Sequence, residues 1–337
     1  MKRASTMIPK VGAMLGLLCL IFDSKCAVES AAKAIDLCLK TVIPSLFPMF
    51  VLSCYLLQGL GTGGKFASQL ESMARLPAGS GGIYLIGLLG GFPVGAQSIA
   101  QAVSAKRLSR QDGERMLGFC NNCSPAFLFG IAGHLFGSIR YPAILWLIQA
   151  ECSLMVALLW ANQPAVENFS PAGRPQPVNC ISRAVSSMVS VCSWIILAGV
   201  CNGFLSRWLY PLMPGVLAVF LSGVTELTSG VLALGQIPQE PLRLILCSML
   251  LNFGGLCVAL QVRSIASVCG LSVGAYLAQK CVQALLGGLL AAGVWFVGVW
   301  LLPASLLVFI FLKNLLEKNR ETVYNSTHKG GFHHAVP

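Results

Sequence analysis

Apolar runs long enough to cross a lipid bilayer recur along this chain. A transmembrane helix needs about 20 consecutive apolar residues, and runs of that order occupy 41–60, 83–103, 141–160, 184–205 and 242–263. Only 10% of the residues are charged, whereas a soluble domain has about 25%. So few charges cannot cover a soluble surface. The runs do not alternate as in an outer-membrane barrel, so the sequence predicts an all-α polytopic membrane protein.

Positive charge gathers in short clusters between the apolar runs. The net charge is +11, from 23 basic and 12 acidic residues. A basic stripe with interleaved aromatic residues would indicate nucleic acid as a partner, and the sequence has none. Basic residues near both ends of the chain favour cytoplasmic termini. These residues are Lys2, Arg3, Lys10, Lys313, Lys318 and Arg320.

The distribution of apolar runs divides the chain into two membrane halves. The halves are 1–160 and 181–312, and 161–180, with four prolines, is a linker loop. A polar tail follows at 313–337. Residues 8–22 predict a first membrane anchor, because no small-x-small cleavage site of a signal peptide follows them. The sequence leaves open whether this run is cleaved.

Residues 25–40 predict an amphipathic helix. Their charged residues recur at steps of three and four, which places them on one helical face. Glu29–Lys33 and Asp36–Lys40 are pairs four residues apart in the favourable order. We expect this helix to lie along the membrane surface. A solvated helix packed on the bundle is the alternative.

Helix breakers and uncharged polar residues interrupt four of the apolar segments. A backbone group without a partner in hydrocarbon costs several kcal/mol, so such breaks persist only where they face protein or a wet cavity. Transporters place broken helices in corresponding positions of two halves around a midplane site. The segments expected to be broken are 83–103, 118–137, 211–236 and 242–263. The predicted helix breaks are Gly91, Pro93, Gly95, Pro125, Gly230, Gly254 and Gly255.

Hydrogen-bonding side chains surround these breaks, and we predict that they bind a substrate. A single amide in a membrane bundle is more often a helix–helix contact, worth about 0.6 kcal/mol. Four clusters on four breaks favour a site, and we expect Gln97, Asn121, Glu226 and Asn252 to line one cavity. The predicted substrate-binding residues are Gln97, Ser98, Asn121, Asn122, Ser124, Thr225, Glu226, Thr228, Ser229, Asn252 and Gln261.

Two acidic residues lie within apolar segments. An acid at membrane depth is a functional candidate by default. Glu226 lies among polar residues and breaks, and we expect it to bind a coupling cation or to hold a proton. Glu151 has only Gln149 and Ser153 as polar neighbours in the sequence, and its role stays open.

Catalytic and cofactor motifs do not fit the sequence. GLGTGGK at 59–65 resembles phosphate-binding fingerprints, but those follow a β-strand and here a membrane helix precedes the motif. Cys120 and Cys123 have CxxC spacing without the second pair or the histidines of a structural zinc site. The sequence also lacks the H-E-x-x-H motif of zinc proteases. We therefore expect no enzyme, no metal and no cofactor.

The motifs at the breaks resemble those of YlbJ-type sporulation integral membrane proteins, within the wider nucleoside-recognition (Gate) family. GGFPVGAQ, FCNNCSPAF, TELTSG and NFGGLCVALQ carry the resemblance, in this order, over roughly 41–261. The resemblance implies a fold similar to concentrative nucleoside transporters, with two repeats, re-entrant hairpins and broken helices. It also implies movement of dipicolinic acid across a forespore membrane. Composition and spacing show nothing of this substrate.

Motifs and resemblance together predict a multi-pass membrane transporter or permease for a small anionic metabolite such as dipicolinic acid. A non-transporting membrane scaffold of sporulation or envelope assembly is one alternative, and a nucleoside transporter is another. The expected partners are the lipid bilayer, the small-molecule substrate and a coupling cation or proton. The sequence does not determine the substrate, the coupling ion, the direction of transport or the oligomeric state.

Overall fold

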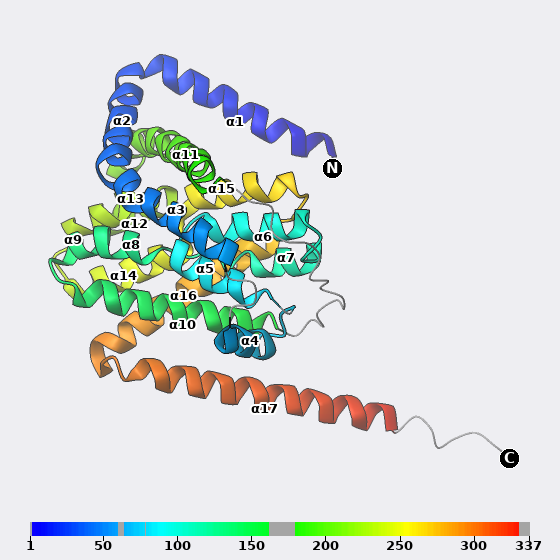
Figure 1. Ribbon diagram of the computed structural model, residues 1–337. Helices are drawn as coiled ribbons and strands as arrows, with labels where there is room; N and C mark the ends of the chain where they lie inside the picture. The colour runs from blue at the N-terminus through cyan, green and yellow to red at the C-terminus, as the bar shows by residue number, and fades with distance from the viewer. Residues whose placement is uncertain (1, 60–63, 78, 162–178, 330–337) are drawn as a thin grey trace.

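The computed structural model describes residues 2–59, 64–77, 79–161 and 179–329 (Figure 1). Within these ranges every element is a helix. In the same part of the chain, five helical stretches are long and apolar enough to cross a membrane, namely Ser24–Leu52, Arg140–Leu159, Cys180–Trp208, Glu240–Val268 and Gly274–Val297. The prediction of an all-α polytopic membrane protein is confirmed.

The first elements of the described chain are a single helix and a long bent helix. The elements are α1 (Lys2–Phe22), α2 (Ser24–Leu37), the π-helical turn η1 (Cys38–Val42) and α3 (Ile43–Gly59). Asp23 accepts a hydrogen bond from the backbone N–H of Cys26 at 3.2 Å and so caps α2, as a short acidic residue does at this position. The predicted amphipathic helix 25–40 is α2 with the start of η1. It lies across the direction of the long helix α10 (Arg140–Leu159) (Figure 1).

The rest of the first half is a helical hairpin, an interrupted helix and a long helix. The arms α5 (Gly81–Gly90) and α6 (Val94–Ser104) pack side by side as a hairpin. The interrupted helix consists of α7 (Arg110–Met116), an extended stretch at 121–124, and the continuous turns α8 (Pro125–Phe127), η2 (Leu128–Ala132) and α9 (Gly133–Phe136). The long helix is α10. The short α4 (Gly64–Met73) precedes the hairpin.

The second half presents the same order of elements. The long helix α11 (Cys180–Trp208) comes first, followed by η3 (Tyr210–Leu212). A hairpin of α12 (Gly215–Thr225) and α13 (Leu227–Ala233) follows, and then η4 (Leu234–Gln236). The interrupted helix is α14 (Glu240–Phe253) and α15 (Gly255–Val268), and the next long helix is α16 (Gly274–Val297). The chain ends with α17 (Leu301–Lys329).

Packing between the halves places the hairpins and interrupted helices inside the bundle. Helix α16 packs against α14 and α10, whereas α11 packs along α2 and α3. We call the contact between α11 and the continuous α2–η1–α3 helix the α11 seam. The hairpins and the interrupted helices lie beneath this seam, so it closes one side of the region where the chain breaks gather.

Three predicted segments differ from the structure or lie partly outside it. Helix α17 continues to Lys329, well into the range 313–337 that the sequence marks as a polar tail, and 330–337 lie outside the described residues. Most of the predicted linker, 162–178, lies outside the described residues, as do 60–63 of the GLGTGGK turn.

Candidate functional site

The chain breaks of the two halves meet at one place in the bundle. A side-chain methyl on Gly91, at the tip of the α5–α6 hairpin, would lie 2.6 Å from the Cβ of Ser124 in the first interrupted helix. A methyl on Gly254, at the break of the second interrupted helix, would lie 2.8 Å from the Cζ of Phe92. The tip of the first hairpin therefore contacts the breaks of both interrupted helices.

The tip of the second hairpin reaches the same place. A methyl on Gly255 would lie 3.3 Å from the backbone nitrogen of Leu227, the first residue of α13. Cys123 donates a thiol hydrogen bond to the backbone oxygen of Leu251 at 3.6 Å, which joins the extended stretch 121–124 to α14. All four breaks thus gather beneath the α11 seam.

In the extended stretch of the first interrupted helix, a side chain satisfies both backbone groups of Cys123. Gln149 of α10 accepts from the N–H of Cys123 at 3.2 Å and donates to its C=O at 2.8 Å. The Ser124 hydroxyl accepts from the N–H of Phe127 at 3.1 Å and caps the next helix. Non-helical backbone at membrane depth persists only with such partners. Specific side-chain hydrogen bonds therefore stabilise this break.

Three of the predicted helix breaks have other roles. Pro125 is the first residue of α8, where its missing N–H costs nothing, so it starts a helix and does not kink one. Gly95 lies inside α6, and a methyl there would lie 1.7 Å from the backbone oxygen of Cys120. Gly230 lies inside α13, and a methyl there would lie 1.9 Å from the Cα of Gly223. Both glycines allow close backbone contact.

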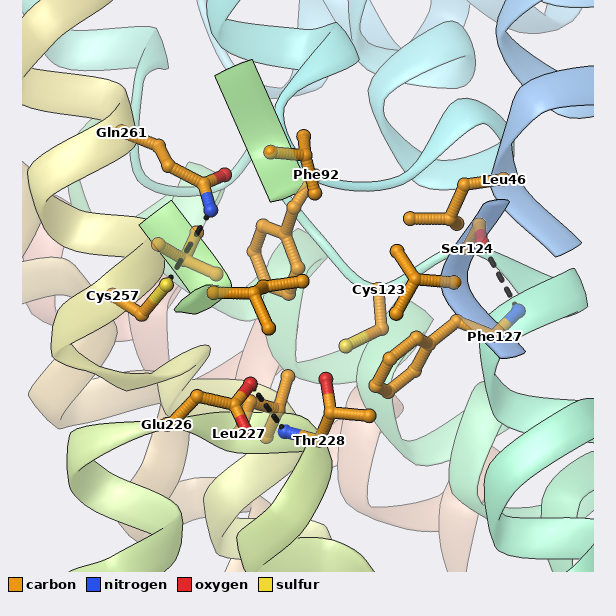
Figure 2. A pocket seen from close by; sticks show the side chains of 14 residues that line it. Leu46, Phe92, Cys123, Ser124, Phe127, Glu226, Leu227, Thr228, Cys257 and Gln261 are labelled. Atoms are coloured by element: carbon orange, nitrogen blue, oxygen red, sulfur yellow. Dashed lines mark hydrogen bonds between the residues drawn. The ribbon is translucent and has the colours of Figure 1, made fainter. Parts of the chain in front are cut away.

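A cavity lies where the breaks meet, and we call it the central cavity (Figure 2). Its volume of about 40 Å³ is room for a few water molecules. The wall is mostly apolar, and Phe92 lies between Gln261 and Cys123 (Figure 2). The lining residues are Val42, Leu46, Phe92, Cys123, Ser124, Phe127, Val191, Ile195, Glu226, Leu227, Thr228, Cys257, Val258 and Gln261.

Polar groups of the second half face the central cavity. The Glu226 carboxylate is 2% exposed and caps α13, accepting from the N–H of Thr228 at 2.9 Å, the N–H of Ser229 at 2.7 Å and the Ser229 hydroxyl at 2.5 Å. Helix N-termini favour negative charge. The Gln261 amide donates to the Cys257 sulfur at 3.5 Å, and its oxygen is buried without a hydrogen bond. That oxygen can accept from a ligand.

A second, larger cavity lies between α2 and the C-terminal part of α11, and we call it the vestibule. Its volume is about 400 Å³. Glu226 and Ile195 line both the vestibule and the central cavity. The exposed residues Glu29, Lys33 and Arg207 bring charge to its wall. The polar face of α2 thus opens, in part, into a cavity that leads to Glu226.

A third cavity, of about 20 Å³, lies at the other end of the seam, and we call it the Gln97 cavity. Gln97 of α6 donates to the hydroxyl of Ser187 on α11 at 2.9 Å. Ser98 and Arg183 also line this cavity. The first half's predicted glutamine therefore binds the seam and does not face Glu226.

One face of α11 lines all three cavities. Arg183 and Ser187 line the Gln97 cavity, Val191 and Ile195 the central cavity, and positions from Ile195 to Ser206 the vestibule. Steps of three and four residues keep these positions on one face. The helix rises about 1.5 Å per residue, so the row spans roughly 35 Å, comparable with the ~30 Å hydrocarbon core of a bilayer.

The prediction that Gln97, Asn121, Glu226 and Asn252 line one cavity is wrong. Of these four, Glu226 lines the central cavity and Gln97 lines a different one. The Asn252 amide turns back to the oxygen of Ser248 on its own helix, at 2.9 Å. Asn121 is fully buried, beneath α6.

The other predicted site residues divide among several surroundings. Ser124, Thr228 and Gln261 line the central cavity, and Ser229 lines the vestibule. Asn122 and Thr225 are not among the residues that line the three cavities. Thr225 donates to the backbone of its own helix at 3.0 Å. Local sequence does not determine which way a side chain at a break turns.

A buried lysine is the polar group that the sequence analysis missed. Lys280 of α16 is 0% exposed. Its ammonium donates to the Gln283 amide oxygen at 2.9 Å and to the Asn122 amide oxygen at 3.3 Å. It also lies over the Phe92 ring, 5.5 Å from the centroid. The signal was present, because a lysine in an otherwise apolar helix is a functional candidate by default.

Glu151 lies apart from the breaks. The Ser305 hydroxyl of α17 donates to its carboxylate at 2.5 Å. Glu151 lines an apolar groove with residues of α5 and α17, such as Leu88 and Leu302. Its contacts therefore join α10 to α17 at the side of the bundle, and they do not involve the three cavities along the α11 seam.

Comparison with known proteins identifies a curated relative by sequence. The chain is similar to the curated sporulation integral membrane protein YlbJ of Bacillus subtilis (strain 168), with 25% identity over 295 residues, covering 73% of this chain and 72% of the relative. The similarity supports the YlbJ-type family. The predicted resemblance to YlbJ-type proteins is thus confirmed. No family model and no solved structure matches the chain, and the Gate domain stays a prediction.

Proposed function

We propose that this YlbJ-type membrane protein transports a small polar metabolite along the α11 seam. The observation that carries the proposal is the row of three cavities on one face of α11, with the breaks of both halves meeting at the middle cavity. Broken helices around such a site are the arrangement that secondary transporters use. Non-helical backbone at membrane depth is tolerated where it is buried in protein or lines a water-filled cavity, and here the breaks line a cavity.

The cavities differ in a way that fits alternating access. The vestibule of about 400 Å³ brings solute to Glu226, and the central cavity of about 40 Å³ is narrowed by apolar residues such as Leu46 and Ile195. In this proposal the hairpins and interrupted helices move against the seam, which widens the central cavity and closes the vestibule. The shared order of elements in the two halves is then a structural repeat, with α5–α6 and α12–α13 as re-entrant hairpins.

The substrate we propose is a small anionic metabolite, with dipicolinic acid as the first candidate. Support comes from the similarity to a protein named for sporulation and from the hydrogen-bonding groups of the central cavity, Ser124, Thr228 and Gln261. A forespore membrane is the matching location. The beginning of α1 and the end of α17 lie toward the same end of the molecule (Figure 1), which is consistent with both termini being cytoplasmic.

Glu226 is proposed to couple transport to a cation or a proton. Its carboxylate faces both the vestibule and the central cavity, so an ion that reaches it from the vestibule meets the substrate there. The backbone donors of α13 hold it in place. Asn122 and Asn252, predicted to bind substrate, become supports of the breaks in this proposal, because their amides bond to Phe119 and Ser248.

Solute uptake by liposomes that contain the purified protein tests the proposal. The compared solutes are dipicolinate and uridine, and empty liposomes measure leakage. We expect protein-dependent uptake of dipicolinate and little uptake of uridine. Preference for uridine would favour the nucleoside transporter. Uptake of neither solute above the empty liposomes would favour the scaffold.

A further inference from the structure

We infer that Lys280 is the counter-charge for an anionic group of the substrate and that Phe92 screens it from the central cavity. The inference rests on the transport function proposed above and names the feature of the substrate that the site selects. It assigns a role to a side chain that lies behind the cavity wall.

The ammonium of Lys280 is buried among neutral partners. The ion pairs of the described residues do not include Lys280, and its two hydrogen bonds go to side-chain amide oxygens, at 2.9 and 3.3 Å. Burying a charge costs a great deal unless an opposite charge is near. A lysine held in this way inside a membrane bundle has no opposite charge beside it among the described residues, and an anionic ligand would supply one.

One aromatic ring separates Lys280 from the central cavity. The ammonium lies over one face of Phe92, 5.5 Å from the ring centroid, and Phe92 itself lines the cavity. A cation over an aromatic face is attracted by the ring's quadrupole, so the ring holds the ammonium when no anion is bound. Phe92 is at the hairpin tip beside Gly91, whose φ is +79°. Rotation of this ring, or a shift of the tip, brings the ammonium into the cavity.

The neighbours of Lys280 already join the helices without it. The Gln283 amide donates to the Asn122 oxygen at 2.8 Å, which ties α16 directly to the first interrupted helix. Gln279 donates to the backbone oxygen of Arg115 at 2.9 Å and ties α16 to α7. Links between helices therefore account for the amides of Gln279 and Gln283, but they do not account for the charge of Lys280.

A carboxylate in the central cavity fits between two opposite charges. Lys280 behind Phe92 attracts it, and Glu226 across the cavity repels it unless a cation or proton accompanies the substrate. When a solute with an anionic group binds together with a cotransported cation or proton, the charges in the site are neutralised. This arrangement selects anions over neutral compounds of the same shape, because specificity is a difference of affinities and only the anion gains the attraction of Lys280.

Binding of two probes to the detergent-purified protein tests the inference. The probes are pyridine-2,6-dicarboxylate and the neutral pyridine-2,6-dicarboxamide, which has a similar shape. Loss of one member of a buried charge pair costs at least about 2 kcal/mol, and every 1.4 kcal/mol is about tenfold, so Lys280→Met should weaken dicarboxylate binding by at least about thirtyfold. Dicarboxamide binding should change by less than about twofold, since it lacks the charge. Lys65→Met, at an exposed lysine of α4, is the matched control and should leave both affinities unchanged.

A second variant keeps the test independent of the folding of Lys280→Met. Phe92→Ala removes the screen and should tighten dicarboxylate binding without tightening dicarboxamide binding. Unchanged dicarboxylate binding in Lys280→Met, or equal loss of both probes, would show that Lys280 is structural. No dicarboxylate binding by the parent would also overturn the inference. Binding that depends on Lys280 without uptake into liposomes would overturn the proposed transport and leave the inference standing.

Discussion

The tips of the two hairpins lie beside the same cavity and present different chemistry to it. The α5–α6 tip presents the Phe92 ring, with the Lys280 ammonium of α16 over its face. The α12–α13 tip presents the Glu226 carboxylate, held by the N-terminus of its own helix. The two halves share an order of elements, but their hairpin tips differ: the first presents an aromatic ring backed by a lysine of the second half, and the second presents a carboxylate. Under the proposed function, that asymmetry lets an anion bind together with a cation or proton.

The two hairpins also differ in what holds them. Gly87 and Gly95 of the first hairpin lie against the backbone oxygen of Cys120, and methyl groups there would come within 1.8 and 1.7 Å of it. Gly223 and Gly230 of the second hairpin lie against each other. The first hairpin is thus fixed to the interrupted helix beside it, whereas the second is fixed mainly arm to arm.

The largest expected effect comes from separating the first hairpin from its neighbour. Gly95→Val forces the backbone of Cys120 to move, and overpacking costs about 3 kcal/mol or more where the contacting atom is rigid. We expect loss of folded protein or a strongly lowered melting temperature in detergent. Gly82→Ala, in α5 where a methyl would have nothing within 4 Å, is the control and should melt like the parent. Equal melting temperatures for the parent, Gly95→Val and Gly82→Ala would show that the close contact is not formed.

The next effect compares the breaks of the two interrupted helices. Gln149→Leu leaves both the N–H and the C=O of Cys123 without their partner, and each such group costs about 1–3 kcal/mol. Ser248→Ala removes one hydrogen bond, to the oxygen of Gly287 at 2.8 Å, and should cost about 1 kcal/mol. In unfolding measurements in detergent, Gln149→Leu should therefore be much less stable than Ser248→Ala. The reverse order would contradict the role given to Gln149.

A smaller effect on stability, with a large effect on uptake, is expected at the second hairpin tip. Glu226→Gln keeps one of the two capping oxygens and should cost about 1 kcal/mol as a weakened cap. Dipicolinate uptake should fall close to that of empty liposomes, because the group that binds the coupling ion is gone. Glu240→Gln, at an acid in the first turn of α14, is the control and should transport like the parent. Parental uptake by Glu226→Gln would remove this residue from the mechanism.

The smallest effect is expected at the far end of the seam. Gln97→Leu removes the hydrogen bond to Ser187, worth about 0.5–1.5 kcal/mol, and leaves the central cavity untouched. Dicarboxylate affinity should stay within about twofold of the parent, with a modest fall in melting temperature. Affinity lost at Gln97 to the same degree as at Lys280 would mean that the substrate binds at the Gln97 cavity.

The positions of most breaks could be predicted from the sequence because they depend on local chemistry. Gly91 and Gly254 adopt positive φ, +79° and +86°, which favours glycine. Ser124 before Pro125 has the composition of a helix start. These signals need no knowledge of the neighbouring helices, and they indicated both interrupted helices and the first hairpin, whereas Gly230, the break predicted in the second hairpin, lies inside α13.

The lining of the cavities could not be predicted, because it depends on how distant elements pack. Asn252 and Glu226 both lie in a polar cluster beside a predicted helix break. The Asn252 amide bonds to its own helix, whereas the Glu226 side chain faces two cavities. Gly95 and Gly230 contact backbone that only the fold brings near. Lys280 lies far along the chain from the clusters at the breaks, and its place beside Phe92 follows from the packing of α16.

The central claim, that the substrate moves along the α11 seam, is tested most directly by blocking the seam. Ile195 lines both the vestibule and the central cavity, and Leu197, two residues on, is 55% exposed on the outer face of the same helix. Dipicolinate uptake into liposomes is measured for the parent, Ile195→Trp and Leu197→Trp at equal protein content. The account predicts that Ile195→Trp lowers uptake to the level of empty liposomes while Leu197→Trp matches the parent. Undiminished uptake by a folded Ile195→Trp would contradict it.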